Sequence, residues 1–393
     1  MFSVIIILII KNDYVRQQES VRKQKRIPSL ESMMLKENKK IVIVTGSLGS
    51  GGLERVTALI ANWYASKNWN VYIVLLLNVG DNCFVDLDPN VNIISYPNKA
   101  EPNSIKKLFL SIKWISFLKK VFKQIKPSVV LAMTLKICAL CCLSCNKTTR
   151  IVMREISDPK SKVRNRIVDR ILFLITQKRV NSIIFQTNWE RSCYPLIMQK
   201  KGSVIPNPVL VDVEASNEKK LEIVTMGRLL NNQKRHDVLI ESFSIFHKKH
   251  PDYILKIYGN GPDGNKDMQL IKKLNIEKSV LLKSATPTVH DEIKDASMFV
   301  MTSDYEGLSN ALVEAMLIGI PCITSNWPGA EDVIKNEING LIYKRQDINE
   351  LVMCMEKMLD KSLALKVSSL GKKEKEKYNI ENVLPLYGKE IEG

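Results

Sequence analysis

Hydrophobic and polar residues alternate along most of the chain in a pattern that separates short strands from longer helices. Short β-branched runs such as 40–45 are typical of buried strands, and stretches with apolar residues at helical spacing lie between them. In the first half the strand-like runs are 40–45, 71–77, 129–133, 150–153 and 182–186, with helical stretches near 53–67, 104–126, 162–178 and 188–199. This alternation predicts a doubly wound parallel sheet.

A break in the pattern comes at Pro206 and Pro208, and a polar linker then runs to Lys220. Two prolines within three residues exclude a helix and favour a fixed extended turn. The predicted fold class is therefore α/β, with two Rossmann-like doubly wound domains that face a cleft and bind ligands at the carboxyl ends of their strands. After the break the strand-like runs are 221–226, 253–258, 280–283, 298–302, 321–324 and 341–343, with helices at 235–250 and 310–318.

The predicted domain organisation has four parts. Residues 1–33 form an N-terminal extension that is disordered or not part of the native protein, because a clean strand–helix pattern begins only at Lys39 and two methionines, Met33 and Met34, precede it. The apolar run of this extension, residues 2–10, is about half as long as a membrane span requires. The two Rossmann-like domains are residues 34–206 and 207–375, and residues 376–393 form a C-terminal helix that returns to the first domain.

Charge is distributed unevenly between the two halves. The 393 residues carry a formal net charge of +17, from 58 Lys and Arg against 41 Asp and Glu. Residues 34–206 hold 27 basic and 10 acidic residues, whereas residues 207–393 hold 25 and 28. A one-sided basic surface normally faces a polyanion, either nucleic acid or an anionic membrane, and a solvated surface without a partner is the alternative. With 45% hydrophobic and 25% charged residues, the composition excludes a disordered or collagen-like protein.

Eight cysteines raise the question of a metal site or of disulfides. Four of them, Cys138, Cys141, Cys142 and Cys145, have the spacing of one helical face, and no second pair of Cys or His stands nearby. We expect buried free thiols in a reducing cytoplasm rather than zinc ligands.

Two loops that follow strands have a composition suited to anions. Gly51 and Gly52 open the first helix, where bare backbone N–H groups can face an anion; a simple tight turn is the alternative. Their spacing is not that of a dinucleotide-binding loop, and no Walker lysine follows. After strand 221–226, Arg228 and Lys234 could converge on one diphosphate or be ordinary surface charges.

The most specific segment is 303–316, Ser-Asp-Tyr-Glu-Gly-Leu-Ser-Asn-Ala-Leu-Val-Glu-Ala-Met. Glu306 lies in the loop after a strand, and Glu314 lies eight residues later within the following helix. Between them, the N–H groups of 308–311 form a helix N-terminus that suits phosphate. A carboxylate at the strand end can accept hydrogen bonds from sugar hydroxyls, and one on the helix can bind a ribose diol. A helix with ordinary solvated acids would not explain Gly307.

This segment resembles the E-x7-E motif of retaining glycosyltransferases of family 4, which have the two-domain GT-B fold. Similar segments follow in the family's order over about residues 39–345, and the chain resembles the members that build bacterial surface polysaccharides. The matching segments are the glycine loop 49–54, Pro206-Asn207-Pro208, Gly227-Arg228-Leu229 with Lys234, Gly259-Asn260-Gly261-Pro262 and Gly319-Ile320-Pro321.

The resemblance implies a role for each matching residue. Arg228, Lys234 and Glu306 would be the catalytic residues, with the two cations on the diphosphate of a nucleotide-sugar donor and Glu306 on the donor sugar. Glu314 would hold the ribose. Such cations and N–H dipoles stabilise the charge on the departing nucleotide diphosphate. The other donor-binding residues implied are Gly51, Gly52, Asn207, Gly259, Gly261, Gly307, Leu308, Ser309, Asn310 and Ala311.

Many members of the family place a histidine near the donor sugar in the first domain, but all four histidines of this chain lie in the second half. Thr134 stands at the corresponding strand end, and Glu155 resembles an acid of some polysaccharide-assembling relatives; both are candidate acceptor contacts. Retaining transfer does not require an enzyme base, because the leaving phosphate oxygen can take the acceptor proton. No Asp-x-Asp pair stands at a strand end, so no metal or other cofactor is expected.

Helix 104–126 holds seven lysines and no acid. One apolar stripe of this helix includes Ile105 and Ile112, and a second, with Trp114 and Phe117, lies on roughly the opposite side. One stripe can cover the sheet while the tryptophan stripe enters the inner leaflet of a membrane; a helix buried on both sides is the alternative. We expect a lipid-diphosphate-linked glycan as acceptor, an anionic membrane surface as partner and no nucleic acid. The expected location is the inner face of the cytoplasmic membrane.

The residues leave several functions open. A transferase that moves a sugar, from a UDP-sugar by preference, to a lipid-linked glycan of O-antigen, capsule or exopolysaccharide explains the motifs and the charge together. A GT-B sugar-nucleotide epimerase would share the diphosphate-binding groups but would not need a basic membrane-facing domain. A nucleic-acid-binding protein would leave Glu306 and Glu314 without a role. A non-catalytic partner subunit of a transferase would not require them either.

Overall fold

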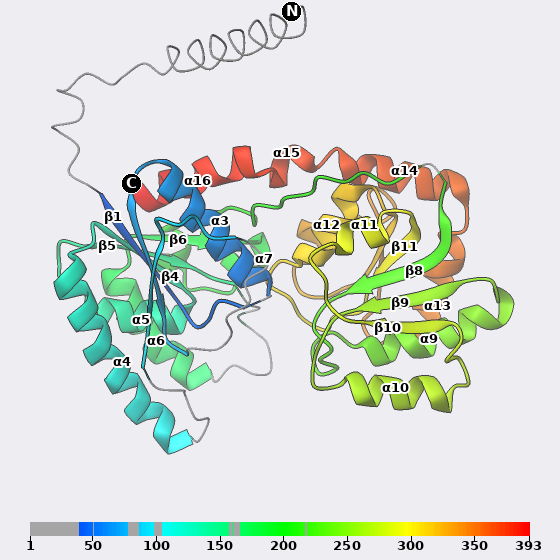
Figure 1. The fold of residues 1–393 in the computed structure, drawn as a ribbon, viewed down its shortest axis with the longest axis horizontal. Helices are drawn as coiled ribbons and strands as arrows, with labels where there is room; N and C mark the ends of the chain where they lie inside the picture. Colours follow the sequence, from blue (N-terminus) through cyan, green and yellow to red (C-terminus); the bar gives the residue numbers. More distant parts are fainter. Residues whose placement is uncertain are drawn as a thin grey trace, which may run out of the picture. The chain divides into compact units, whose positions relative to one another are not determined.

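The computed structural model describes residues 39–49, 51–77, 86–97, 104–156, 159, 166–216 and 218–393. The predicted extension, residues 1–33, lies outside the described residues. Residues 40–393 form one compact unit that contains two parallel sheets, and each sheet with its covering helices is termed a lobe (Figure 1). The two sheets confirm the prediction of two Rossmann-like α/β domains.

The first lobe is built on a seven-stranded sheet with the order β3-β2-β1-β4-β5-β6-β7. Every neighbouring pair of strands is parallel. The chain builds outward from β1 to β3 and then resumes at β4 on the other side of β1, so the switch point at which such sheets bind ligands lies between β1 and β4. The strands are β1 (Lys40–Thr45), β2 (Asn70–Leu75), β3 (Asn92–Ser95), β4 (Val129–Met133), β5 (Arg150–Arg154), β6 (Ser182–Phe185) and β7 (Gly202–Val204).

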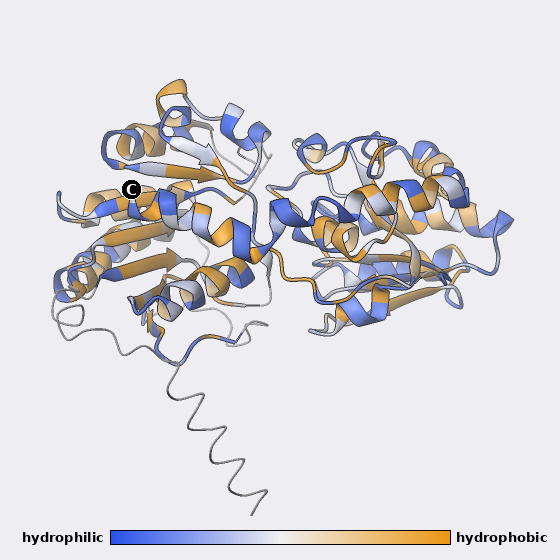
Figure 2. Ribbon diagram, turned by 90° about the horizontal axis from the view of Figure 1, so that it is seen from above, coloured by the Kyte–Doolittle hydropathy of each residue, from blue (hydrophilic) through white to orange (hydrophobic). Residues whose placement is uncertain are grey.

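Helices cover both faces of this sheet. Successive residues of a strand point to opposite faces, so Val42 packs in the core beneath α4 and α5, and Ile41 packs in the core beneath α3. The strands are accordingly hydrophobic along most of their length, as Figure 2 shows. The helices are α3 (Gly52–Ser66), α4 (Ser104–Ile125), α5 (Leu135–Ser144), α6 (Arg166–Arg179), α7 (Asn188–Ser192) and α8 (Leu196–Gln199).

The second lobe has a six-stranded parallel sheet with the order β10-β9-β8-β11-β12-β13. Its switch point lies between β8 and β11. The strands are β8 (Lys220–Met226), β9 (Ile254–Tyr258), β10 (Val280–Lys283), β11 (Ala296–Met301), β12 (Cys322–Ser325) and β13 (Leu341–Tyr343). The helices are α9 (His236–Lys249), α10 (Gly264–Lys273), α11 (Val289–Ile293), α12 (Asn310–Ile318), α13 (Ile348–Lys357), α14 (Lys361–Lys372) and α15 (Lys375–Tyr378).

The last helix, α16 (Ile380–Glu392), packs against the first lobe (Figure 1). Its Leu384 and Tyr387 are buried in the same core as Ile41 of β1. Arg150 at the start of β5 donates hydrogen bonds of 3.0 Å to the backbone oxygens of Glu390 and Ile391. The end of the chain is therefore held by the first lobe rather than by the second.

The elements differ from the sequence prediction at several places, and the helices α10, α13 and α14, of 10, 10 and 12 residues, were not predicted. The predicted helix 188–199 is two helices, α7 and α8, separated by Pro195, whose ring and missing N–H interrupt an α-helix. The strands β3 and β7 were not predicted either, because both lie at edges of the sheet and their residues are exposed or only partly buried, so they form no uninterrupted apolar run.

The tryptophan stripe of α4 is buried. Trp114, Leu118 and Val121 lie in the core of the first lobe, and Phe117 packs against it, whereas Ile112 on the other stripe is 58% exposed. The prediction that the tryptophan stripe enters a membrane is therefore wrong: the sheet and α5 cover the stripe that buries the larger apolar area. Among the described helices, none combines the length and the apolar character needed to cross a membrane.

The cysteine cluster lies on α5 and at its end. Cys138 and Cys141 are fully buried, and burial raises the pKa of both thiols. Cys142 and Cys145 are only partly buried, and none of the cysteines that the structure describes forms a disulfide. The prediction of buried thiols is confirmed for the first two residues and holds in part for the others.

Candidate functional site

Lys234 and Glu306 form an ion pair between two loops of the second lobe. Lys234 lies between β8 and α9, and Glu306 lies between β11 and α12. The Nζ of Lys234 donates to Oε1 of Glu306 at 2.6 Å, and the two side chains are 18% and 9% exposed. Arg228, in the same loop as Lys234, is exposed and makes no ion pair or side-chain hydrogen bond with the rest of the described chain. The structure thus pairs Lys234 with Glu306 and leaves Arg228 accessible to an anion from solution.

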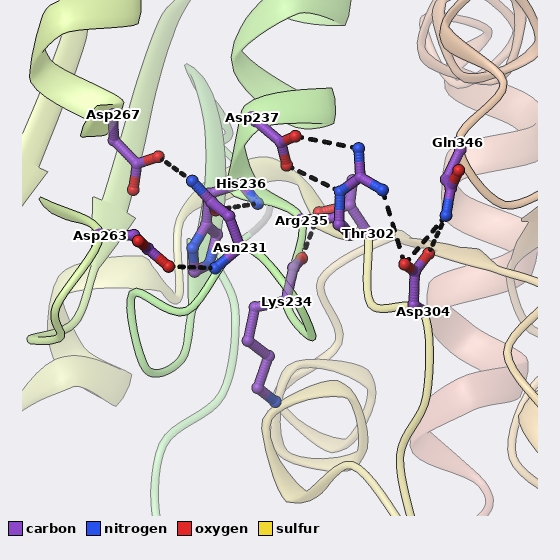
Figure 3. A network of polar contacts seen from close by, with 10 residues as sticks. All are labelled: Asn231, Lys234, Arg235, His236, Asp237, Asp263, Asp267, Thr302, Asp304 and Gln346. Carbon is purple, nitrogen blue, oxygen red and sulfur yellow. Dashed lines mark hydrogen bonds and ion pairs between the residues drawn. The ribbon is translucent and has the colours of Figure 1, made fainter. Parts of the chain in front are cut away.

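A network of polar contacts ties the loop of Lys234 to the loop after β11 (Figure 3). Arg235 donates two hydrogen bonds of 2.9 Å to the carboxylate of Asp237 and lies 3.5 Å from that of Asp304. The Thr302 hydroxyl donates to the backbone oxygen of Lys234 at 2.8 Å. These contacts hold the backbone on both sides of Lys234, so its ammonium can move only through rotations of its own side chain.

A second part of the network anchors the middle of the same loop (Figure 3). The Asn231 backbone N–H donates to Asp263 at 2.9 Å, its amide donates to Asp267 at 2.5 Å, and its side-chain oxygen accepts from the His236 N–H at 3.1 Å. Burial raises the pKa of Asp267 to about 6. Burial and the nearby Lys234 charge lower the pKa of His236 to about 4. Sequence reasoning missed these residues, because the partners lie 32 and 36 positions apart and share no local spacing.

Gly259 and Gly261 pack against the backbone of the loop that holds Lys234. A Cβ on Gly259 would collide with the backbone oxygen of Gly227, and a Cβ on Gly261 would collide with that of Leu229. The neighbouring backbone can approach each of these two positions so closely only because glycine has no Cβ. The resemblance implies donor binding for both glycines, and the structure adds this packing role.

The N-terminus of α12 is formed by residues 308–311. Ser309 is its N-cap, and its hydroxyl accepts a hydrogen bond from the Leu312 N–H at 3.4 Å. Gly319 ends the helix in the left-handed conformation with φ of 95°. The first N–H groups of an α-helix have no partner within it, so this end suits a phosphate or a sugar oxygen.

Glu314 is 6% exposed and contacts two residues that sequence reasoning missed. Its Oε1 accepts a hydrogen bond from Arg55 Nη1 at 2.9 Å, and its Oε2 lies 2.9 Å from Nε2 of His290. Arg55 belongs to α3 of the first lobe, and His290 to α11 of the second. Arg55 and Glu314 are 259 positions apart, and neither Arg55 nor His290 stands in a spacing that distinguishes it from a surface residue.

A series of hydrogen bonds connects the two lobes beside these carboxylates. The buried Arg154 donates to the side-chain oxygen of Asn207, and Asn207 donates to that of Asn310 at 2.5 Å. Asn310 in turn donates to the backbone oxygen of Gly52 at 3.4 Å. Three residues singled out from the sequence, Asn207, Asn310 and Gly52, are therefore brought together where the hinge, α12 and α3 meet.

Gly307 lies at a second contact between the lobes. A Cβ on Gly307 would be 2.5 Å from the backbone oxygen of Ile156 and 2.9 Å from Nε2 of Gln186, and both residues belong to the first lobe. The contact thus leaves no room for a side chain. Gly51 is the N-cap of α3, where a Cβ would meet the carboxylate of Glu54.

The two candidate acceptor contacts, Thr134 and Glu155, have different surroundings. Thr134 follows β4 and is the N-cap of α5, with a φ of 132° that costs a non-glycine residue about 1–3 kcal/mol and is found mostly at functional sites. Glu155 is fully buried, and its carboxylate accepts hydrogen bonds from the Ile156 N–H at 3.0 Å and from the Tyr194 hydroxyl. Glu155 therefore presents no surface to an acceptor, contrary to the expectation from the sequence.

The acidic side chains of the site contact basic residues rather than one another. Glu306 contacts Lys234, and Glu314 contacts Arg55 and His290. Within the described ranges, no group of three or more His, Cys, Asp and Glu side chains is arranged to hold a metal ion.

Residues 208–377 match the family model of glycosyl transferases group 1. An uncharacterized glycosyltransferase of Haemophilus influenzae is 26% identical over 353 residues, covering 88% of this chain and 98% of the relative. The N-acetylgalactosamine-N,N'-diacetylbacillosaminyl-diphospho-undecaprenol 4-alpha-N-acetylgalactosaminyltransferase of Campylobacter jejuni is 25% identical over 345 residues, covering 82% and 90%. A crystal structure of S. aureus TarM that contains UDP is similar in fold, with a TM-score of 0.73 and 16% identity over 90% of this chain and 100% of that chain.

The matched model covers the part of the second lobe that holds the catalytic candidates Arg228, Lys234 and Glu306 and the ribose-binding candidate Glu314. The two relatives extend over most of the chain, and the TarM structure has the same two-lobe fold. The chain is therefore a glycosyltransferase with the GT-B fold.

Proposed function

We propose that this enzyme is a retaining glycosyltransferase of family 4 that moves a sugar from a nucleotide-diphosphate sugar, by preference a UDP-sugar, to a lipid-linked glycan in cell-surface polysaccharide biosynthesis. One observation carries the proposal: the loops that follow β8 and β11 bring Lys234 to Glu306, and α12, which begins directly after the second loop, contributes its N-terminus and Glu314. A cation and a helix N-terminus suit the phosphates, and two carboxylates suit the hydroxyls, of a nucleotide sugar.

The donor diphosphate is proposed to lie between Lys234, Arg228 and the N-terminus of α12. Negative charge develops on the diphosphate as the bond to the sugar breaks. Preorganised cations and N–H dipoles stabilise that charge more in the transition state than in the ground state, and one such group typically contributes about 10²-fold to the rate. Glu306 would accept hydrogen bonds from the donor sugar while it remains next to Lys234, and Gly51 and Gly52 would approach the diphosphate from the first lobe.

Retention of configuration is proposed to need no base from the chain. In retaining transfer the acceptor hydroxyl approaches on the face from which the diphosphate departs, so a phosphate oxygen can take its proton. Thr134, at the switch point of the first sheet, is the proposed acceptor contact. Glu155 would act only by holding the end of β5, since its carboxylate is buried.

The comparisons support the classes of donor and acceptor. The name of the Campylobacter jejuni relative specifies a diphospho-undecaprenol substrate, and the TarM structure contains UDP. No metal is proposed, because Lys234 and Arg228 supply the positive charge that a cation would otherwise bring to the diphosphate.

The proposed location is the inner face of the cytoplasmic membrane, and α6 is the proposed contact with anionic lipid. Ile167, Ile171 and Leu174 of α6 are 71%, 55% and 57% exposed and follow the i, i+4, i+7 spacing of one helical face. Arg170 and Lys178 beside them are exposed as well. Apolar side chains flanked by basic ones suit an anionic membrane surface better than nucleic acid.

Vesicle flotation tests this contact. At low salt we expect the protein to float with vesicles that contain phosphatidylglycerol and not with phosphatidylcholine alone. Ile171→Glu combined with Leu174→Glu should abolish flotation, whereas Met353→Glu combined with Leu365→Glu, at exposed apolar positions of α13 and α14, should leave it unchanged. Flotation of the α6 variant at the wild-type level would exclude α6 as the contact.

The donor is tested by a thermal-shift screen against UDP-sugars and GDP-sugars, because a ligand that binds only the folded state raises the melting temperature. We expect at least one UDP-sugar to do so, and Glu314→Ala to weaken its binding in calorimetry. Glu356→Ala, at a surface ion pair on α13, is the matched control and should bind as the wild type does. The absence of a shift with every nucleotide sugar would refute the proposed donor site.

Analysis of the reaction products distinguishes a glycosyltransferase from an epimerase and from a non-catalytic subunit. With donor and a lipid-linked acceptor, we expect NMR to find a product that keeps the anomeric configuration of the donor. Conversion of the donor sugar to its epimer without acceptor would indicate an epimerase instead. Donor binding without turnover would indicate a non-catalytic subunit.

A further inference from the structure

We propose that Arg55 and His290 are positioning residues that orient the Glu314 carboxylate toward the ribose of the donor, so that full ribose binding requires contact between the first lobe and α12. The inference rests on the donor site proposed above. The inference gives a function to two residues that lie outside the segment from Glu306 to Glu314 and that belong to different lobes.

Each oxygen of the Glu314 carboxylate has one of these partners. Arg55 Nη1 donates to Oε1 at 2.9 Å, and His290 Nε2 lies 2.9 Å from Oε2. The side chain of Glu314 is 8% exposed, and those of Arg55 and His290 are 30% and 13% exposed. The carboxylate is therefore held from two sides and largely shielded from water.

This arrangement leaves acceptor capacity for a sugar. An ionised carboxylate has about four lone-pair positions, and two of them are used here. The two remaining positions match the two hydroxyls of a ribose. Glu314 thus keeps two acceptor positions for ribose hydroxyls besides those that Arg55 and His290 use.

The two contacts also fix the plane of the carboxylate. A glutamate side chain has three rotatable bonds, and binding a ligand with a freely rotating carboxylate costs conformational entropy at the moment of binding. Contacts that hold the carboxylate beforehand remove this cost from the binding step, which raises affinity and demands a defined position of the two hydroxyls. Arg55 and His290 thus act on the ribose through Glu314.

Arg55 couples this orientation to the first lobe. It lies in the first turn of α3, where its N–H donates to the backbone oxygen of Gly51 at 3.1 Å. The same turn begins with Gly52, whose backbone oxygen accepts from Asn310 of α12 at 3.4 Å. Approach of this turn to α12 therefore brings the Arg55 guanidinium to Glu314 at the same time.

Discrimination between UDP and 2'-deoxy-UDP in calorimetry tests the proposal, because it measures contacts to one ribose hydroxyl. We expect wild-type protein to bind UDP about tenfold or more tightly than 2'-deoxy-UDP, the effect of one hydrogen bond to a charged group. Arg55→Ala and His290→Ala should each lose most of this ratio by weakening UDP binding selectively. Arg55→Lys and His290→Gln, which keep a donor, should recover part of it. Lys67→Ala, at the other end of α3, should keep the full ratio.

The possible outcomes separate this inference from the donor site itself. A full ratio in both Arg55→Ala and His290→Ala would overturn the positioning role while leaving the donor site intact. An equal loss of affinity for both nucleotides would overturn it as well, since Arg55 would then only hold the lobes together. If Arg55→Ala does not fold, His290→Ala gives the same test. Wild-type protein that binds neither UDP nor GDP would refute the donor site, and the positioning role with it.

Discussion

The ammonium of Lys234 and the carboxylate of Glu306 meet at 2.6 Å across two loops that are 72 positions apart in the sequence. Because both groups are largely shielded from water, either one alone would be costly to bury, so each stabilises the position of the other. The pair places a cation suited to a diphosphate next to a carboxylate suited to a sugar. The pair therefore brings together the two charged groups that the proposed nucleotide-sugar site requires.

Lys234→Ala and Arg228→Ala should both reduce turnover, but only the first should reduce stability. Each substitution removes a cation from the proposed diphosphate site, so we expect turnover to fall by about 10²-fold. Lys234→Ala also leaves the Glu306 carboxylate without its partner, which should lower the free energy of unfolding by about 1–3 kcal/mol. Arg228 is exposed, and its removal should change stability by less than about 0.5 kcal/mol.

Steady-state kinetics and urea unfolding measure these two effects. Lys248→Ala, at an exposed position of α9, is the control and should resemble the wild type in both. Wild-type turnover in Lys234→Ala or in Arg228→Ala would contradict the role of that residue at the diphosphate.

Gly307→Ala should impair activity by disturbing a contact between the two lobes. The new Cβ would lie 2.5 Å from the Ile156 backbone oxygen of the first lobe, a distance that a backbone atom can relieve only by moving the lobes apart. We expect a turnover at least about 10²-fold lower, because misplacing reacting groups by about 1 Å has an effect of that size. Gly49→Ala, where no atom lies within 4 Å of the added Cβ, is the matched control and should remain active. Equal activities of the two variants would show that the Gly307 contact is dispensable.

Asn207→Ala and Asn207→Asp should separate the two contacts of this amide. Alanine leaves the buried Arg154 guanidinium without its acceptor, so the free energy of unfolding should fall by about 1–3 kcal/mol. Aspartate keeps that acceptor and should restore most of the stability. It cannot donate to Asn310, so turnover should stay reduced in both variants. Urea unfolding and kinetics on the same preparations test this, and a fully active Asn207→Asp would argue against a role for the Asn310 contact.

The sequence predicts the elements of the fold where they are long or strongly apolar. The strand β4 and the helix α12 appear with the predicted bounds, because an uninterrupted apolar run and a capped helix are local features. The two apolar stripes of α4 show that a local pattern does not reveal which side of a helix is buried. Both stripes are apolar, and only the position of the sheet and of α5 decides that Trp114 is buried and Ile112 exposed.

For the candidate site, too, the sequence predicts the local features and not the contacts between distant residues. Glu306 and Glu314 stand in one short segment and could be recognised there. Their partners in space could not, because Arg55 and His290 reach Glu314 from separate elements and their spacing along the chain carries no information about it. The burial of Glu155 also depends on tertiary packing, in which Tyr194 covers a carboxylate that the sequence places simply at a strand end.

The stability of the enzyme should depend on pH through His236, which is 2% exposed at the start of α9. Burial, with the nearby Lys234 charge, lowers the pKa of its imidazole from 6.5 to about 4. Between these two values the unfolded chain binds a proton that the folded chain does not. The free energy of unfolding therefore falls as the pH drops from 6.5 to 4, and it is unaffected by this group above pH 7. A shift of this size corresponds to at most about 3 kcal/mol.

His236→Gln isolates this contribution, because glutamine stays neutral over the whole range. Asp267, whose pKa is raised to about 6, titrates in both proteins, so its contribution largely cancels in the difference between them. Urea unfolding from pH 7.5 to pH 4 should therefore find the difference in unfolding free energy shifting in favour of the variant as the pH falls. A difference that does not change with pH would mean that the imidazole ionises equally in the folded and unfolded chains, and that the start of α9 does not exclude water from it.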